Sequence, residues 1–379
     1  MPGSGNATAS PDDTIKPYVA FNTLYDSNFF RRPDNVDSEL INQVNGGFDV
    51  DWKISRQHIL IKANVNQNWF QSFSNLNYIG WDTQAQWNWQ FGSVLNGEIG
   101  YANKQFLGSF AQLSSQIPNL QNNQRYFANT SYLFHPNGKI KFGVFRTENR
   151  FDDKSRQDNN NTEDNAELNL QYLSPTGSIL GLRLLATDGQ YPQRPLLPND
   201  NTLDNAYTRF NYAVTWDWHA SSKTRIDGLF GYTQQQHAHF RNLDFADIIA
   251  QFNLHWQASD KTLLELSAKR DIYQANNRSA SFLLTQGVEI KSTWQASPKI
   301  ALTLPVSYQQ QQFLGNSGNS STGNFQQIDN VSNIGFNLMY HPVDNISIGA
   351  VLNYEKRDSN DPRRSYEIQS AGINFQAVF

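Results

Sequence analysis

The sequence has no cysteine and no long apolar run. The absence of cysteine excludes disulfide bonds and thiolate chemistry, and it suits a protein that must pass an oxidising periplasm without forming wrong disulfides. No segment approaches the roughly 18–20 apolar residues that a membrane-spanning helix needs, and the mean hydropathy is −0.61. A helical membrane protein is therefore excluded. A membrane β-barrel stays open, because only every second residue of its strands faces lipid.

An excess of charge of one sign is also missing. The net charge is −4, which gives no indication of nucleic-acid binding. No signal peptide is visible at Met1, and the opening Met-Pro-Gly-Ser-Gly resembles a mature-form or cloning remnant that says nothing about secretion. Aromatic residues, in contrast, are plentiful: they make up 13% of the chain, with nine Trp, sixteen Tyr and twenty-five Phe.

A hairpin pattern repeats along the chain. Eight times, an alternating segment ends in an aromatic residue, passes a short turn of Pro, Gly, Asn, Asp or Ser, and is followed by another alternating segment. Trp256 before Gln257-Ala258-Ser259-Asp260 is one example. Between the hairpins lie longer polar connections, such as residues 152–164, 188–204 and 315–327. Short turns on one side and long loops on the other are typical of outer-membrane barrels.

The hairpins set the expected number of strands. Eight hairpins give sixteen strands, and segments 18–25 and 366–379 add one at each end. We therefore predict an all-β fold, a transmembrane antiparallel up-and-down β-barrel of about eighteen strands over residues 14–379, preceded by a flexible segment 1–13. An even number places both termini on the periplasmic side. A period near 40 residues also fits a β-propeller, but a propeller blade has four short strands where each unit here has two of nine to eleven residues.

Aromatic residues beside the turns fall on the apolar face of their strands. A ring of aromatics at one height is typical of the interfacial girdle of a membrane barrel. The alternative is a soluble sandwich or barrel with aromatic core residues, which gives no reason for Trp beside successive turns. The predicted girdle consists of Trp52, Trp87, Trp89, Tyr132, Tyr172, Trp216, Trp218, Trp256, Trp294 and Tyr340.

The opposite face of each strand is polar. A charge on the lipid face costs about 2–4 kcal/mol near the bilayer midplane, so this alternation orients the sheet around a polar lumen. These charges either pair across neighbouring strands as a solvated wall or line a transport path, and the many Asn and Gln amides on the same face suit sugar hydroxyls as well as water. The predicted lumen residues are Asp49, Asp51, Lys62, Asp82, Glu98, Lys141, Glu167, Arg183, Arg209, Asp217, Arg225, Asp227, Glu265, Lys269, Glu289 and Lys291.

Two further segments bear on assembly and on access to the lumen. Phe379 ends an alternating strand, as in the signal by which the barrel-assembly machinery recognises its substrates. The connection 104–124 is long and more apolar than the others. We expect it to fold inward or cap the channel, the alternative being a loop that packs on its own rim.

Signals for an enzyme are weak. His237 and His239 form a short His-x-His motif in a predicted surface loop, where an incidental pair is commoner than a metal site. No Ser-His-Asp or paired-carboxylate arrangement can be assembled with useful specificity. We expect no enzymatic activity, no metal and no cofactor.

The N-terminal region carries a resemblance to a known family. Lys16-Pro17-Tyr18-Val19-Ala20-Phe21 is followed by Tyr25-Asp26-Ser27-Asn28-Phe29-Phe30-Arg31, which is similar to the opening of EpsL-like outer-membrane barrels from exopolysaccharide operons. Phe29 and Phe30 stand where an aliphatic residue is commoner in that family. The resemblance implies polysaccharide export, a role in biofilm formation, and a periplasmic polysaccharide-export protein as partner.

Our main hypothesis from sequence is thus a channel for exopolysaccharide export in the outer membrane of a Gram-negative bacterium, with membrane lipid and the secreted polysaccharide as partners. The first alternative is a general or sugar-selective diffusion porin for small solutes. An adhesive barrel acting through its Asn-rich loops and, more remotely, an outer-membrane hydrolase are the remaining alternatives.

Overall fold

The computed structural model describes residues 14–112, 118–196, 203–274, 280, 282–314 and 326–379. The segment 1–13, predicted to be flexible, lies outside these residues. Among the residues described, no helix is both long and apolar enough to cross a membrane.

The described residues form one antiparallel sheet of eighteen strands. The strands are β1 (Ile15–Asp26), β2 (Glu39–Ile54), β3 (Gln57–Phe70), β4 (Tyr78–Phe91), β5 (Leu95–Leu107), β6 (Leu120–His135), β7 (Gly138–Phe151), β8 (Asn161–Leu173), β9 (Ile179–Gln190), β10 (Ala206–Ser221), β11 (Thr224–His237), β12 (Phe245–Ser259), β13 (Thr262–Gln274), β14 (Phe282–Ser297), β15 (Ile300–Leu314), β16 (Ile328–Val343), β17 (Ile346–Ser359) and β18 (Tyr366–Val378).

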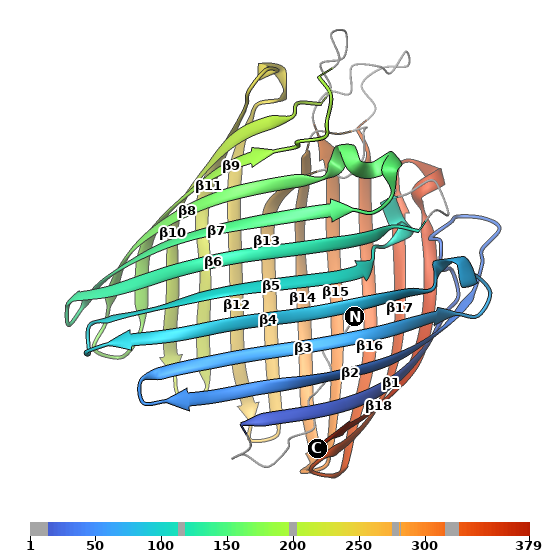
Figure 1. Cartoon of the computed structure of the whole chain (residues 1–379), viewed down its shortest axis with the longest axis horizontal. Coiled ribbons are helices and arrows are strands. Elements are labelled where there is room, and N and C mark those ends of the chain that lie inside the picture. Colours follow the sequence, from blue (N-terminus) through green and yellow to red (C-terminus); the bar gives the residue numbers. More distant parts are fainter. Residues whose placement is uncertain (1–13, 113–117, 197–202, 275–279, 281, 315–325) are drawn as a thin grey trace.

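The sheet closes on itself. Each strand pairs with its neighbours in sequence, and β1 also pairs with β18, with Phe21 opposite Phe375. The strands of the first half cross in front of those of the second half in Figure 1, as the two walls of a tilted barrel do. The predicted fold, a closed antiparallel barrel of about eighteen strands, is confirmed.

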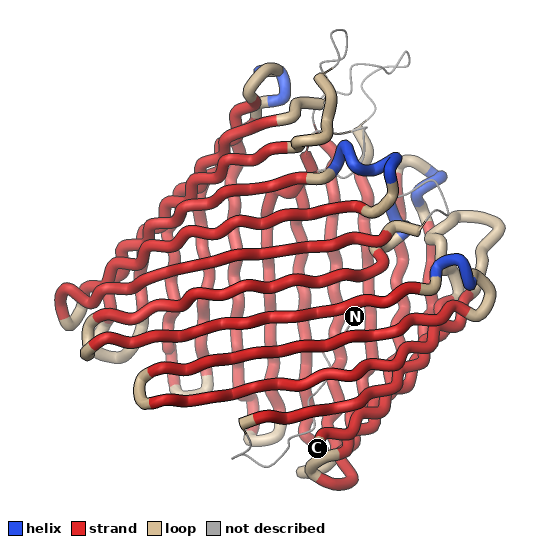
Figure 2. The backbone as a smooth tube through the Cα atoms, viewed as in Figure 1, coloured by secondary structure: helices blue, strands red, loops and turns tan. Residues whose placement is uncertain are grey.

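Tight turns lie at one end of the barrel and long connections at the other. The eight predicted short turns join β2 to β3, β4 to β5, and so on to β16 and β17. The opposite end carries the short 3-10 helices η1 (Ser74–Leu76), η2 (Phe110–Gln112), η3 (Lys154–Asn159), η4 (Arg241–Leu243) and η5 (Pro362–Arg364) (Figure 2). We call these the turn end and the loop end. β1 begins and β18 ends at the turn end, where the Phe379 N–H donates to the Pro17 carbonyl at 2.8 Å.

The strands are longer than the sequence pattern suggested. They run for 12 to 16 residues rather than nine to eleven. Residues 161–164, predicted as loop, belong to β8, and residues 188–190 belong to β9. Polar composition was a poor marker of strand ends, because the sheet continues beyond the apolar region of the wall.

Side-chain parity separates two faces around the whole ring. On β10, Tyr212, Val214 and Trp218 are exposed on one face, while residues such as Asp217 alternate with them on the other. Charges appear on the outward face towards the loop end, where Arg146 of β7 and Asp164 of β8 form an ion pair of 2.6 Å with both side chains half exposed. The apolar outward band therefore gives way to polar wall near the loops.

The predicted girdle residues lie near the turn end on the outward parity. Eight of the ten are exposed, whereas Trp89 and Trp216 are half-buried. Each of these two rings lies over a glycine of the next strand, Gly97 and Gly228 respectively, where an added Cβ would meet the ring at 2.5 and 2.7 Å. These glycines leave room for the indoles to lie flat against the wall.

Val214→Arg tests the assignment of faces. Val214 lies outward between Leu182 and Phe230 of the neighbouring strands, so an arginine there would put a charge into lipid. We expect a loss of about 2–4 kcal/mol in the free energy of unfolding, measured by urea titration in lipid vesicles. Thr215→Arg is the matched control, since its side chain enters the lumen, and it should cost less than about 1 kcal/mol. Equal losses would contradict the assignment.

Candidate functional site

The lumen wall is the candidate site. The strand register puts all sixteen predicted charges on the face opposite the exposed apolar residues; for example, Lys62 lies between Asp49 of β2 and Gln84 of β4. Their role in transport remains a prediction.

Many of these charges form ion pairs with the adjacent strand. Arg183 lies 2.8 Å from Glu167, Arg225 lies 2.8 Å from Asp217, and Lys291 lies 2.6 Å from Glu265. Lys104, which was not predicted, lies 3.0 Å from Asp82. Glu98 instead accepts hydrogen bonds from the Gln86 and Asn129 amides at 2.7 and 2.5 Å. Most of the wall thus balances its own charge, as the solvated-wall interpretation expects.

Amide side chains form a network on β1 to β3. The Gln43 amide donates to Asn68 at 2.8 Å, and the Asn68 amide donates to Asn66 at 2.6 Å. Asn22 and Asn45 both donate to the Gln43 carbonyl oxygen. Because these amides satisfy one another, this side of the lumen presents a rigid and neutral polar surface.

An apolar cluster lies directly above this network at the loop end. The mouth cluster contains the buried Phe29, Phe30, Phe70, Leu76 and Phe110. Its members come from three loops and one strand, and the ring centroids of Phe30 and Phe110 lie 5.0 Å apart while those of Phe29 and Phe70 lie 5.4 Å apart. Phe70 belongs to the inward-facing set of β3, so the cluster packs on the lumen side of the wall. Sequence reasoning missed it, because its members are dispersed among polar loops.

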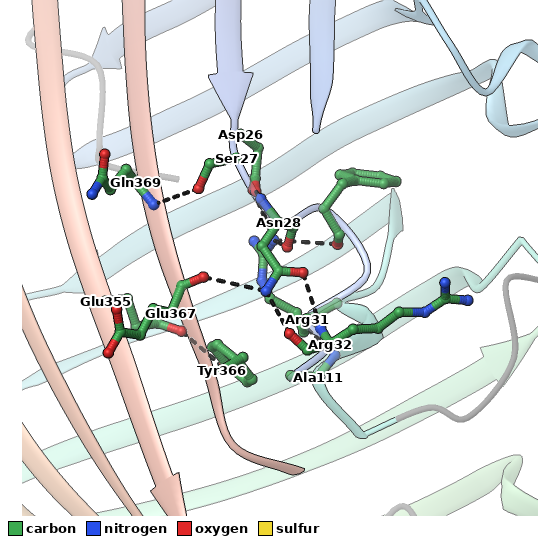
Figure 3. Close-up of polar contacts among 12 residues, drawn as sticks. Asp26, Ser27, Asn28, Arg31, Arg32, Ala111, Glu355, Tyr366, Glu367 and Gln369 are labelled. Carbon is green, nitrogen blue, oxygen red and sulfur yellow. Dashed lines mark hydrogen bonds and ion pairs between the residues drawn. The ribbon is translucent and has the colours of Figure 1, made fainter. Parts of the chain in front are cut away.

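The β1–β2 loop that supplies Phe29 and Phe30 is held by buried polar contacts (Figure 3). The Asn28 amide donates to the Arg32 and Glu367 carbonyls at 2.7 and 3.2 Å. Arg31 has a left-handed backbone with φ of 61°. Its guanidinium lies 2.8 Å from Asp26 and donates to the Asn28 carbonyl at 2.6 Å. The loop is therefore fixed to β1 and β18 while it holds two phenylalanines in the mouth.

The β5–β6 loop folds inward, as we expected for the connection 104–124. Phe110 packs in the mouth cluster, and the Arg357 guanidinium of β17 donates to the Ala111 carbonyl at 2.9 Å. Five strands separate β5 from β17 around the ring, so this contact crosses the mouth. Arg357 is itself buried 3.6 Å from the buried Asp329. The tip of the loop, residues 113–117, lies outside the described residues.

Two cavities open on the lumen side of the wall. The loop-end cavity, about 440 Å³, is lined by amides such as Asn123 and Asn161, by Tyr191 and Tyr273, and by Arg209, which lies 3.2 Å from Glu163. The turn-end cavity, about 450 Å³, is lined by residues that include Lys139, Lys141, Glu98 and His58. Both volumes fall in the range of about 300–1,000 Å³ that is usual for small-molecule sites. Neither Glu163 nor Lys139 is among the lumen residues predicted from the sequence.

Within the β9–β10 connection above the loop-end cavity, Tyr191, Arg194 and Asp204 contact one another. The Arg194 guanidinium stacks 3.5 Å from the Tyr191 ring centroid and donates to the Asp204 carbonyl at 2.8 Å. Burial raises the pKa of Tyr191 to about 12, so this phenol stays neutral. The connection is thus held by stacking and hydrogen bonds.

The two predicted loop histidines have carboxylate partners. His237 Nδ1 lies 3.5 Å from Asp244, and His239 Nδ1 lies 2.9 Å from Asp204. Asp204 also accepts the backbone N–H groups of His239 and Phe240 at 2.7 and 2.9 Å. Burial alone would raise the pKa of Asp204, but these hydrogen bonds outweigh it and lower the pKa. In the part of the chain that the structure describes, no group of three candidate ligands could hold a metal ion.

Comparisons with known proteins agree with this architecture. Residues 216–379 match the family model described as "Putative beta-barrel porin 2", and no curated protein matches the sequence. The Pseudomonas aeruginosa OpdK structure with vanillate is similar with a TM-score of 0.52 at 9% identity, covering 96% of this chain and 99% of that one. P. aeruginosa OccK2 (OpdF) in complex with glucuronate gives 0.52 at 10%, covering 96% and 98%.

A third solved structure, a BenF-like porin from Pseudomonas fluorescens Pf-5, has a TM-score of 0.53 at 8% identity and covers 96% of this chain and 99% of that one. At these identities the likeness establishes the fold. The chain is a β-barrel of the bacterial outer membrane, with the porin architecture.

The predicted relationship to EpsL-like exopolysaccharide barrels is wrong. The family model that matches is a β-barrel porin model, and the similar structures are Occ/Opd-type porins. The residues that suggested the relationship have a local structural role instead: Asp26, Asn28 and Arg31 build the β1–β2 loop, and Phe29 and Phe30 fill the mouth cluster.

Arg31→Ala should release the β1–β2 loop. It leaves the buried Asp26 carboxylate without its cation and removes the guanidinium that donates to the Asn28 carbonyl, at a cost of about 1–3 kcal/mol. We expect faster proteolysis within residues 27–38 of the folded barrel. Arg32→Ala is the matched control, because its exposed pair with Asp37 at 3.3 Å contributes at most about 1 kcal/mol. Equal cleavage of both variants would contradict the role given to Arg31.

Asp204 should make the loop end sensitive to acid. A carboxyl whose pKa is lower in the folded protein stabilises the fold above its ordinary pKa of about 3.9, and this stability is lost as the pH falls through the folded value. We expect the His239 and Phe240 amides to be protected from hydrogen exchange above about pH 4 and to lose protection below it. Asp204→Asn should lower protection at pH 7 and abolish the pH dependence. A pH-independent wild type would refute this role.

Proposed function

We propose that this protein is a diffusion channel for small polar solutes. The mouth cluster is the observation that carries the proposal. Phe110 and Phe29, with ring centroids 5.4 Å apart, come from two loops that are fixed inward by hydrogen bonds from the buried Arg357 and Asn28 side chains. These loops occupy part of the entrance, so a solute enters beside them, which favours small molecules over a polymer chain.

The polar wall supports the same conclusion. Below the mouth, a solute meets amides that already bond one another and charges that are mostly paired. Such a wall replaces water at each step without binding any one solute tightly, as diffusion requires. OpdK and OccK2, which have a similar fold, were solved with vanillate and with glucuronate, and we extend the size of these two solutes to this chain as support for the proposal.

Liposome swelling tests the proposal. Proteoliposomes containing the wild type should swell in isosmotic arabinose or glucose and should not swell in a dextran of several kilodaltons. Phe29→Ala/Phe110→Ala removes two rings of the mouth cluster and should speed swelling in glucose.

Phe91→Ala is the matched control, because Phe91 is 60% exposed at the turn end, far from the mouth. A folded wild-type barrel that admits neither sugar would disprove the proposed function. A sugar permeability that the double substitution leaves unchanged would disprove the role of the mouth cluster.

A further inference from the structure

The turn-end cavity contains two cations that lack the partners found elsewhere on the wall. Lys139 and Lys141 are separated by one residue on β7, so both side chains leave the same face of the strand, with about 6–7 Å of backbone between their Cα atoms. Among the described residues, no carboxylate lies within ion-pair distance of either ammonium group.

The cross-strand neighbours explain this lack. Lys141 lies between Ser131 of β6 and Asn169 of β8. Lys139 lies between Leu133 and Gln171 on the same two strands. All four neighbours are neutral. Lys62, in contrast, has an acid directly opposite, and Lys291 and Arg225 have acids within 2.8 Å.

The remaining charges of the cavity do not neutralise the pair. Glu98, the acid among the lining residues, is held by the Gln86 and Asn129 amides. His58 contacts Asp51 at 2.7 Å. Arg56 adds a third cation and donates to the Gly92 carbonyl at 2.8 Å. The lining therefore has three cations against one carboxylate, and the two lysines repel each other unless an anion lies between them.

We propose that Lys139 and Lys141 form a binding site for small oxyanions, a carboxylate or a phosphate group carried by a passing solute, at the turn end of the lumen. The inference rests on the channel function proposed above and adds the charge of the preferred solute. An ammonium pair on one strand face supplies up to six N–H donors, and the half-enclosed wall strengthens their attraction relative to bulk water. A solute leaving the amide-lined part of the lumen meets this site next.

The test compares Lys139→Gln/Lys141→Gln with Lys223→Gln/Lys261→Gln. The control removes the same charge from two turns at the same end of the barrel, away from the β7 wall. In planar bilayers with a KCl gradient, the chloride-to-potassium permeability ratio of the first variant should fall about twofold or more relative to wild type, and the control should keep the wild-type ratio. The difference should shrink in 1 M salt, where the Debye length is about 3 Å.

Calorimetric titration of the detergent-solubilised barrel gives a readout that needs no conduction. Inorganic phosphate and succinate serve as probes, with glucose as the neutral control. We expect phosphate, succinate or both to bind the wild type, and the lysine variant to lose at least about tenfold in affinity, which corresponds to about 1.4 kcal/mol. Whichever probe binds identifies phosphate or carboxylate as the favoured group.

The experiments distinguish failure of the proposed channel function from failure of the proposed anion site. A folded wild type that does not conduct, yet binds an anion through the two lysines, refutes the channel and keeps the site. A conducting channel whose selectivity and anion binding are unchanged by the lysine substitutions overturns the site. Equal loss of selectivity in both double variants also overturns it, because the effect would then belong to total charge.

Discussion

The constraint on which the rest of the structure depends is that backbone N–H and C=O groups in hydrocarbon must find partners within the protein. This chain meets it by pairing β1 with β18, so that the sheet formed by the described residues has no free edge. Once the sheet is a ring, each strand has one face in lipid and one in the lumen. Apolar and polar side chains must then alternate along the strand. The polar lumen is thus a consequence of closure: half of the side chains must go inward, and an eighteen-stranded ring is too wide for them to fill.

The parts that sequence could predict are those governed by local rules. Alternation such as Ile59, Ile61, Ala63 and Val65 identifies the outward face from one strand alone, and turn residues identify hairpins. The contacts that narrow the mouth are different in kind. Arg357 and Ala111 are 246 residues apart, and no local pattern indicates that they meet. The apolar character of the connection 104–124 predicted that it folds inward, but its partners came only from the three-dimensional structure.

The family prediction was unsafe because it depended on a general barrel pattern and on one more specific motif. Segment 25–31 was the most specific motif in the sequence, and it proved to encode a loop. In this loop Asp26 forms an ion pair with Arg31, and the Asn28 amide donates hydrogen bonds to two carbonyls. Two phenylalanines of the segment pack in the mouth cluster. Such a loop suits any barrel that must hold a connection inward at its entrance. The lysine pair was only half predicted, because Lys141 was recognised as inward while its isolation from acids depends on the neutral residues of β6 and β8.

The length of the strands has a consequence for what the cell presents to its surroundings. A strand of 14 residues, tilted by about 40°, is about 35 Å tall, whereas the apolar band of such barrels is about 25 Å. About 10 Å of hydrogen-bonded wall therefore stands clear of the hydrocarbon, and outward ion pairs such as Arg146–Asp164 lie on it. Beneath the loops, an antibody or a bacteriophage that approaches the bacterium meets this stiff collar, so the surface presented to it includes residues whose geometry is as fixed as that of the barrel interior.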